Sequence, residues 1–148
     1  MIDNVKLLPP DKASQFMCVL RNAMDEIHEG VIIIQDKLSV IELSQTEHDI
    51  FANFNTIYRM CVDKLDIMEE RYGDGEGITS LHLFDVANTL GLLADITRSV
   101  HIIIIYNDNF SEYEKRNISF RVGMIQTSVS WASKKLYHIY EESRGDLK

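Results

Sequence analysis

The sequence predicts an all-α protein built as an antiparallel up-down-up-down four-helix bundle, on three observations. Four stretches of the chain place apolar residues at alternating spacings of four and three, which is one face of a helix. Short polar or glycine-containing segments separate these stretches, and short connections make consecutive helices antiparallel neighbours. The chain has 148 residues with 45% hydrophobic content, enough for one continuous core. We therefore expect a single domain over residues 1–148.

The first predicted helix covers residues 11–43 and follows an N-terminal extension, residues 1–10. The extension ends in Pro9 and Pro10, and proline is excluded from helix interiors but common where a helix begins. The apolar stripe of this helix consists of Leu20, Met24, Ile27, Val31, Ile34, Leu38 and Ile41.

The second predicted helix covers residues 45–72. Ser44 and Glu47 form a capping-box pattern at its start, which leaves almost no loop after the first helix. Its apolar stripe consists of Phe51, Phe54, Tyr58, Cys61, Leu65, Met68 and Tyr72.

The third predicted helix covers residues 80–106, after a glycine-rich segment at 73–77 that cannot hold a helix. Either Thr79 or Ser80 caps it. Its stripe consists of Leu83, Val86, Leu90, Leu93, Thr97, Val100 and Ile104.

The fourth predicted helix covers residues 111–142 and follows a polar turn at 107–109. Ser111 and Glu114 repeat the capping-box pattern at its start. Its stripe consists of Ile118, Val122, Ile125, Val129, Ala132, Leu136 and Ile139.

Two β-branched runs, residues 30–34 and 102–105, compete with this assignment, because buried parallel strands have the same composition. The apolar stripe continues through both runs in unchanged phase, and a strand would interrupt it. We interpret both runs as helical.

Charge and hydropathy narrow the class of protein. The formal net charge of −8 disfavours direct binding to nucleic acid, which requires clustered Lys and Arg. No leading segment resembles a signal peptide, and the longest apolar runs are far shorter than the roughly 20 residues of a membrane-spanning helix. We expect a cytoplasmic protein with no membrane partner. Cys18 and Cys61 are separated by roughly 13 Å along the bundle and are expected to be reduced and packed.

Large apolar residues also occupy positions that should face water in an isolated bundle. We expect them to form one apolar side that serves as an interface, with a second copy of the chain first and a different protein second. The alternative is a wider core in which the termini cover the fourth helix. The residues of this predicted interface are Ile32, Ile33, Ile102, Ile105, Phe120, Met124, Trp131 and Tyr137.

Acidic residues crowd the end of the second helix and the loop after it. The cluster is either a solvated acidic pole or a docking site for a basic protein surface or a loosely held cation. Its members are Asp63, Asp66, Glu69, Glu70, Asp74 and Glu76.

Catalytic and metal-binding patterns are weak. A di-metal bundle needs inward Glu-x-x-His turns on two helices, and the nearest match, Asp25 to His28, lies at the edge of an apolar stripe, so we expect no metal and no cofactor. Arg21 with His28 resembles the widest form of the Arg and His pattern of HEPN-class helical nucleases, which would imply a ribonuclease site built across a dimer. The resemblance covers eight residues.

These observations favour a non-enzymatic bundle that acts through protein binding, as an adaptor, inhibitor or immunity-type protein. An inhibitor is favoured slightly, because an acidic bundle can occupy the basic groove of a nucleic-acid enzyme. The alternative is a dimeric enzyme with a composite site, either HEPN-like or metal-dependent.

Overall fold

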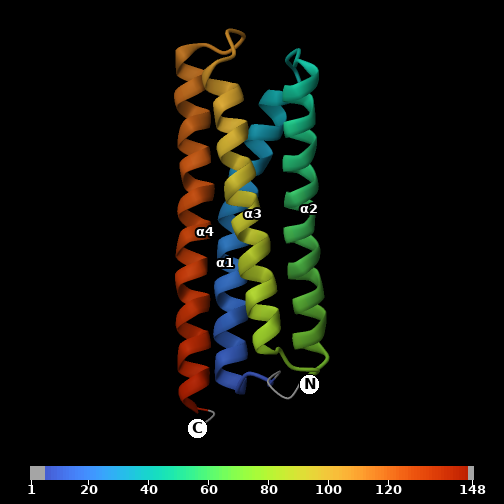
Figure 1. The fold of residues 1–148 in the computed structure, drawn as a ribbon, viewed down its shortest axis with the longest axis vertical. Coiled ribbons are helices and arrows are strands. Elements are labelled where there is room, and N and C mark those ends of the chain that lie inside the picture. The colour runs from blue at the N-terminus through green and yellow to red at the C-terminus, as the bar shows by residue number, and fades with distance from the viewer. Residues whose placement is uncertain (1–5, 147–148) are drawn as a thin grey trace.

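The computed structural model describes residues 6–146 and confirms the predicted four-helix bundle (Figure 1). The helices run alternately up and down. α1 and α3 each contact both α2 and α4, so the four helices form a ring with α4 between α1 and α3. Both β-branched runs are helical. The helices are α1 (Pro10–Leu38), α2 (Gln45–Gly73), α3 (Ser80–Ile105) and α4 (Glu112–Asp146).

The predicted helix boundaries are close to the observed ones except at the end of α1 and of α4. We expected the first helix to reach residue 43, but α1 ends at Leu38 and residues 39–44 connect it to α2. Ser39 ends the helix, since its hydroxyl donates to the carbonyl of Asp36 at 3.0 Å. The apolar pattern extends further because residues of the connection still pack against the core. α4 continues four residues beyond the predicted end at 142.

Helix starts follow the predicted capping chemistry. The Ser44 hydroxyl accepts from the Glu47 amide at 3.2 Å, and the Glu47 carboxylate accepts from the Ser44 amide at 2.9 Å. The same reciprocal pair recurs at Ser111 and Glu114. Thr79 caps α3, and His82 completes that box, since its Nδ1 accepts from the Thr79 amide at 2.9 Å. Each cap satisfies amide groups that a helix start leaves free.

The segment before α1 secures the connection between α2 and α3. The Leu8 amide donates to the carbonyl of Ile78 at 2.7 Å, and Leu7 forms an antiparallel bridge with Thr79. Leu8 and Ile78 are both buried. Gly77 has a φ of +85° and an added Cβ there would lie 2.8 Å from Leu7, so only glycine fits beside that side chain.

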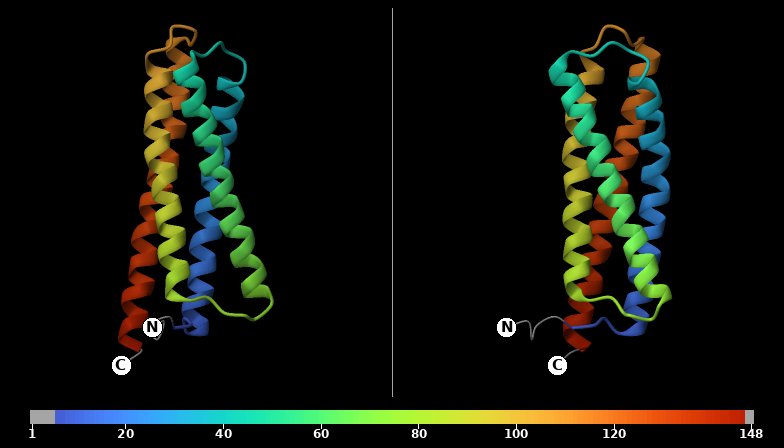
Figure 2. Two further views of the ribbon diagram at one scale, coloured as in Figure 1. Left: turned by 45° about the vertical axis from the view of Figure 1, so that its right-hand side comes forward. Right: turned by 90° about the vertical axis from the view of Figure 1, so that its right-hand side faces the viewer.

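Helix α2 is the least buried of the three helices α1, α2 and α3. Its fully buried residues are Phe54, Cys61 and Met68, whereas Tyr58 and Leu65 of the same stripe are only half-buried. α1 packs much less on α2 than on α4, and Figure 2 (left) shows the lower half of α2 diverging from α1. The space between α1 and α2 is therefore not filled by apolar side chains.

Helix α3 is the most apolar element. Within residues 6–146 it is the helix with the length and hydropathy of a membrane span, a property it shares with the core helices of soluble bundles. Its stripe from Leu83 to Ile104 is buried against its neighbours. Outside this stripe it also exposes large apolar residues, among them Phe84, Ile102 and Ile105.

Candidate functional site

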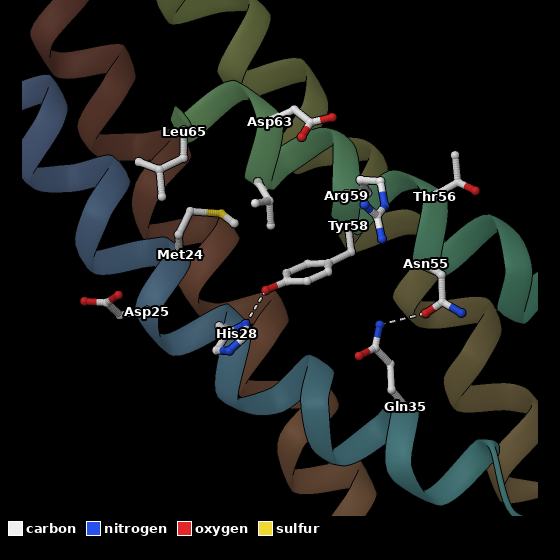
Figure 3. A pocket seen from close by; sticks show the side chains of 11 residues that line it. Met24, Asp25, His28, Gln35, Asn55, Thr56, Tyr58, Arg59, Asp63 and Leu65 are labelled. Atoms are coloured by element: carbon white, nitrogen blue, oxygen red, sulfur yellow. Dashed lines mark hydrogen bonds between the residues drawn. The ribbon is translucent and has the colours of Figure 1, made fainter. Parts of the chain in front are cut away.

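A groove of about 820 Å³ lies between α1 and α2 (Figure 3). Its apolar lining comes from Met24 on α1 and from Val62 and Leu65 on α2. The other lining residues are polar or aromatic: Asp25, His28, Gln35, Asn55, Thr56, Tyr58, Arg59 and Asp63.

Three polar bridges join α1 to α2, two of them in this groove and one, Arg21 to Glu69, beyond its end. Arg21 Nη2 donates to Glu69 Oε2 at 2.9 Å, His28 Nδ1 is hydrogen-bonded to the Tyr58 hydroxyl, and Gln35 Nε2 donates to Asn55 Oδ1 at 2.8 Å. The α1 members are spaced by seven residues, which places them on one line along the helix. The bridges hold the two helices together where apolar packing is incomplete.

Arg21 and His28, the pair that resembles a HEPN motif, are the first two members of this line. Seven residues separate them by about 10 Å along α1, so the structure ties each to its own partner on α2 and does not bring the two together. The hydrogen bond from Arg21 lowers the pKa of Glu69 below its ordinary value, as expected for an ion pair. Arg21 and His28 therefore make two separate contacts from α1 to α2.

Three charged residues of the groove differ from these bridges. Asp25, Arg59 and Asp63 are exposed, and none of their side chains forms a hydrogen bond or ion pair with another residue between 6 and 146. Burial raises the pKa of the neighbouring Tyr58, which stays a neutral hydroxyl. The groove thus combines an apolar lining, bridges between its walls and charges that remain available at its rim.

Sequence reasoning missed this groove. The line of Arg21, His28 and Gln35 at heptad spacing was the available signal, because polar residues that repeat every seven positions mark the edge of a helix contact.

The structure places residues of the predicted apolar interface on both flanks of α4. We expected Trp131 and Tyr137 to share one side, but Trp131 lies beside α1, between two clefts of about 490 and 400 Å³. Tyr137 lies beside α3, in a cleft of about 160 Å³ with Phe84. Six residues rotate a helix position by about 240°, so the two side chains leave α4 in different directions.

Helical periodicity assigns the other predicted interface residues to three sides. Met124 is seven residues before Trp131, so it lies on the α1 side of α4. Phe120 is eighteen residues, or five full turns, before the cleft residue His138, so it lies on the same side. Ile33, seven residues after Glu26, faces the same side, because Glu26 bonds to Ser128 of α4.

On α3, Ile105 follows four residues after His101, which bonds to Ser119 of α4. Ile102 is eighteen residues after Phe84 and occupies the same angular position, beside α4. Ile32, four residues after His28, is turned toward the α2 side. The residues of the predicted interface therefore leave the bundle in several directions, and a shared interface of all eight stays a prediction.

Two of the six acidic-pole residues are ion-paired. Glu69 pairs with Arg21, and Glu76 lies 3.2 Å from Arg71. The remaining four, Asp63, Asp66, Glu70 and Asp74, are exposed without such a partner among the described residues.

The two cysteines are free thiols, and they differ in burial. Cys61 is packed as expected, and burial raises its pKa to about 12. Cys18 was also expected to pack, but it is exposed, because it lies on the side of α1 away from the core and lines a cleft with Trp131. Across residues 6–146 no three His, Cys, Asp or Glu side chains gather as metal ligands.

The chain matches no protein-family model, no curated protein and no solved structure at a significant level.

Proposed function

We propose that the protein is a non-enzymatic helical bundle that acts by binding protein, and that a second copy of the chain binds the outer face of α3 and α4. The α3–α4 face is defined by Phe84, Ile102, Ile105 and Tyr137. The observation that carries the proposal is that α3 exposes large apolar residues outside its core stripe, among them Phe84, Ile102 and Ile105.

Large apolar side chains that stay exposed outside a core stripe are typical of a surface that a partner covers. In the bundle, Ile102 remains 57% exposed and Tyr137 60% exposed. Phe84 packs edge-on against Tyr140 of α4, with ring centroids 4.8 Å apart, so it is already ordered for a contact. Large aromatic and aliphatic residues at the centre of a surface are typical anchors of protein interfaces. This pattern supports a partner on α3.

A cytoplasmic adaptor or inhibitor remains the proposed role. The net charge of −8 favours a basic partner, and an inhibitor of a nucleic-acid enzyme is one protein of that kind. The α3–α4 face supports self-association, and the acidic end of α2 remains available to a further partner.

Sedimentation equilibrium tests the self-association. We expect the wild type to be a dimer and the double variant Ile102→Glu, Tyr137→Glu to be a monomer with unchanged helical circular dichroism, because two buried carboxylates would oppose the contact. Trp131→Glu is the matched control on the α1 side of α4 and should remain a dimer.

Two results would overturn the proposal. One is dissociation by Trp131→Glu but not by the double variant. The other is a wild type that sediments as a monomer; if that monomer also floats with phosphatidylcholine vesicles, α3 binds a lipid surface instead.

A further inference from the structure

We propose that the groove between α1 and α2 is a second docking site, which accepts a basic amphipathic helix from a partner protein. The proposal extends the protein-binding function to a surface on the opposite side of the ring from the α3–α4 face. It does not require self-association.

The shape of the groove matches a helix. Its lining runs from Met24 to Gln35 on α1, eleven residues or about 17 Å, and from Asn55 to Leu65 on α2. Helix α1 forms one wall of the groove and α2 forms the other, and the groove has a volume of about 820 Å³. A helix lying in a groove between two helices is a recurrent mode of peptide recognition. The length suits about three turns of partner helix.

The apolar lining of the groove is incompletely buried in the chain alone. Met24 is buried at its base, but Val62 and Leu65 are only half-buried. The neighbouring stripe residues Cys61 and Met68 are buried. One edge of the α2 stripe therefore packs in the core of the bundle, and the edge with Leu65 faces the groove. Met24 can adapt its shape to different apolar side chains. Apolar anchors of a partner helix would cover this lining.

The rings of His28 and Tyr58 cross the groove at its middle. Their centroids are 6.1 Å apart and the rings are within 24° of parallel, and their hydrogen bond joins the two walls (Figure 3). A partner helix would lie across this pair, with its anchor side chains entering beside Met24 and Leu65. The aromatic pair offers a flat apolar surface for that contact.

The charge of the rim selects a basic partner. Asp25 and Asp63 line the groove on opposite helices, and Asp66 and Glu70 continue the acidic surface along α2. Arg59 supplies a positive charge to the lining, whereas Arg21 is paired with Glu69. Exposed carboxylates that lack partners attract a basic helix and repel an acidic one, which raises association rates and specificity.

Fluorescence anisotropy with labelled peptides tests this site at physiological salt. The probe is a 14-residue peptide of leucine and lysine, with leucine at positions that form one helical face. A peptide with the same leucines and glutamate in place of lysine is the charge control, and a scrambled leucine and lysine sequence is the pattern control. We expect the amphipathic basic peptide to bind and both controls to bind at least about tenfold more weakly.

Two pairs of substitutions locate the binding. Asp25→Asn with Asp63→Asn should weaken the peptide about fivefold or more, because each removes an exposed charge at the rim. Asp95→Asn with Asp108→Asn removes two exposed acids from α3 and the turn after it, and should change the affinity less than twofold. Equal losses in both pairs, or equal binding of the scrambled peptide, would overturn the groove as a specific site.

The monomeric variant of the α3–α4 face separates this proposal from the previous one. If Ile102→Glu with Tyr137→Glu dissociates the dimer and retains the peptide, the two surfaces are independent, as proposed. If that variant loses the peptide along with the dimer, the peptide binds the α3–α4 face and the groove proposal fails, while the self-association stands.

Discussion

Helix α1 contacts two neighbours, and the two contacts are built differently. Toward α4, α1 approaches closely at Gly30, where an added Cβ would lie 2.9 Å from Ile125 Cγ1 and 3.2 Å from the carbonyl oxygen of Arg121. Toward α2, polar bridges and a groove replace close packing. Both contacts arise from helices with a complete apolar stripe. An apolar stripe therefore predicts that a helix packs against its neighbours. It does not predict how closely the helix packs on the neighbour at each edge of the stripe.

The contact with α4 also includes polar groups that reinforce it. The Ser128 hydroxyl donates to Glu26 at 2.8 Å, and the largely buried ammonium of Lys12 pairs with Glu142. These bonds flank a seam in which Ile27 and Ile125 are fully buried. On the α2 side the bridges span a space that the apolar side chains leave open. We expect the two contacts to differ in stability as they differ in packing.

Truncation of a stripe residue in each contact should give the largest difference. Ile125→Ala, at a position with no exposure on the α4 side, should lower the free energy of unfolding by about 2–5 kcal/mol, since it leaves a cavity. Leu65→Ala, half-buried at the groove, should cost less than about half as much, because water already reaches that side chain. Urea denaturation measures both. Equal losses would mean that the two contacts are equally tight.

Glycine substitutions test the close approach of α1 to α4. Gly30→Ala should destabilise the protein by about 1–3 kcal/mol, because the new methyl group meets Ile125 and the backbone of Arg121. Gly123→Ala is the control on α4, where an added Cβ has no neighbour within 4 Å. It should stabilise the protein by about 0.5–1 kcal/mol through helix propensity. Thermal unfolding followed by circular dichroism compares them, and stabilisation by both would refute the close approach at Gly30.

The smallest effect should come from the outermost bridge to α2. Glu69 has a lowered pKa in the folded protein, so the unfolded chain binds its proton more readily as the pH falls. The stabilisation by this bridge is present above the ordinary carboxyl pKa of 4.5 and is lost as the pH falls through the lowered value. At pH 7, Glu69→Gln should cost about 0.2–1 kcal/mol, since the pair is exposed.

The pH dependence provides the check on this bridge. The difference between wild type and Glu69→Gln should diminish in acid, in urea titrations at a series of pH values. Glu70→Gln, at the next position and without an ion-pair partner among the described residues, is the control. A difference for Glu69→Gln that stays constant down to pH 3 would count against a role for the ion pair.

The fold could be predicted because its determinants are periodic. Ile27, Leu90 and Ile125 belong to three predicted stripes, and all three are buried. The end of α1 could not be predicted, because Ile41 and Leu43 continue to pack on the core from a loop and so continue the apolar pattern beyond the helix.

The groove was hidden for a related reason. Tyr58 and Leu65 belong to the apolar stripe of α2 whether or not α1 covers them. The distance between the two helices is not encoded in the apolar spacing of α1 or of α2 alone. Similarly, the directions of Trp131 and Tyr137 depend on the rotation of α4 within the ring.

The close contact of α1 with α4 also has a consequence for the order of folding. It joins the helix nearest the N-terminus to the helix nearest the C-terminus, so it forms only after the whole bundle sequence has left the ribosome. Until then α1 can pair only with α2, across the weaker contact. Because such long-range contacts slow folding, we expect the backbone amide hydrogens of α1 to exchange with solvent until late in assembly. We also expect its apolar stripe to be the segment of the nascent chain that most needs protection from aggregation.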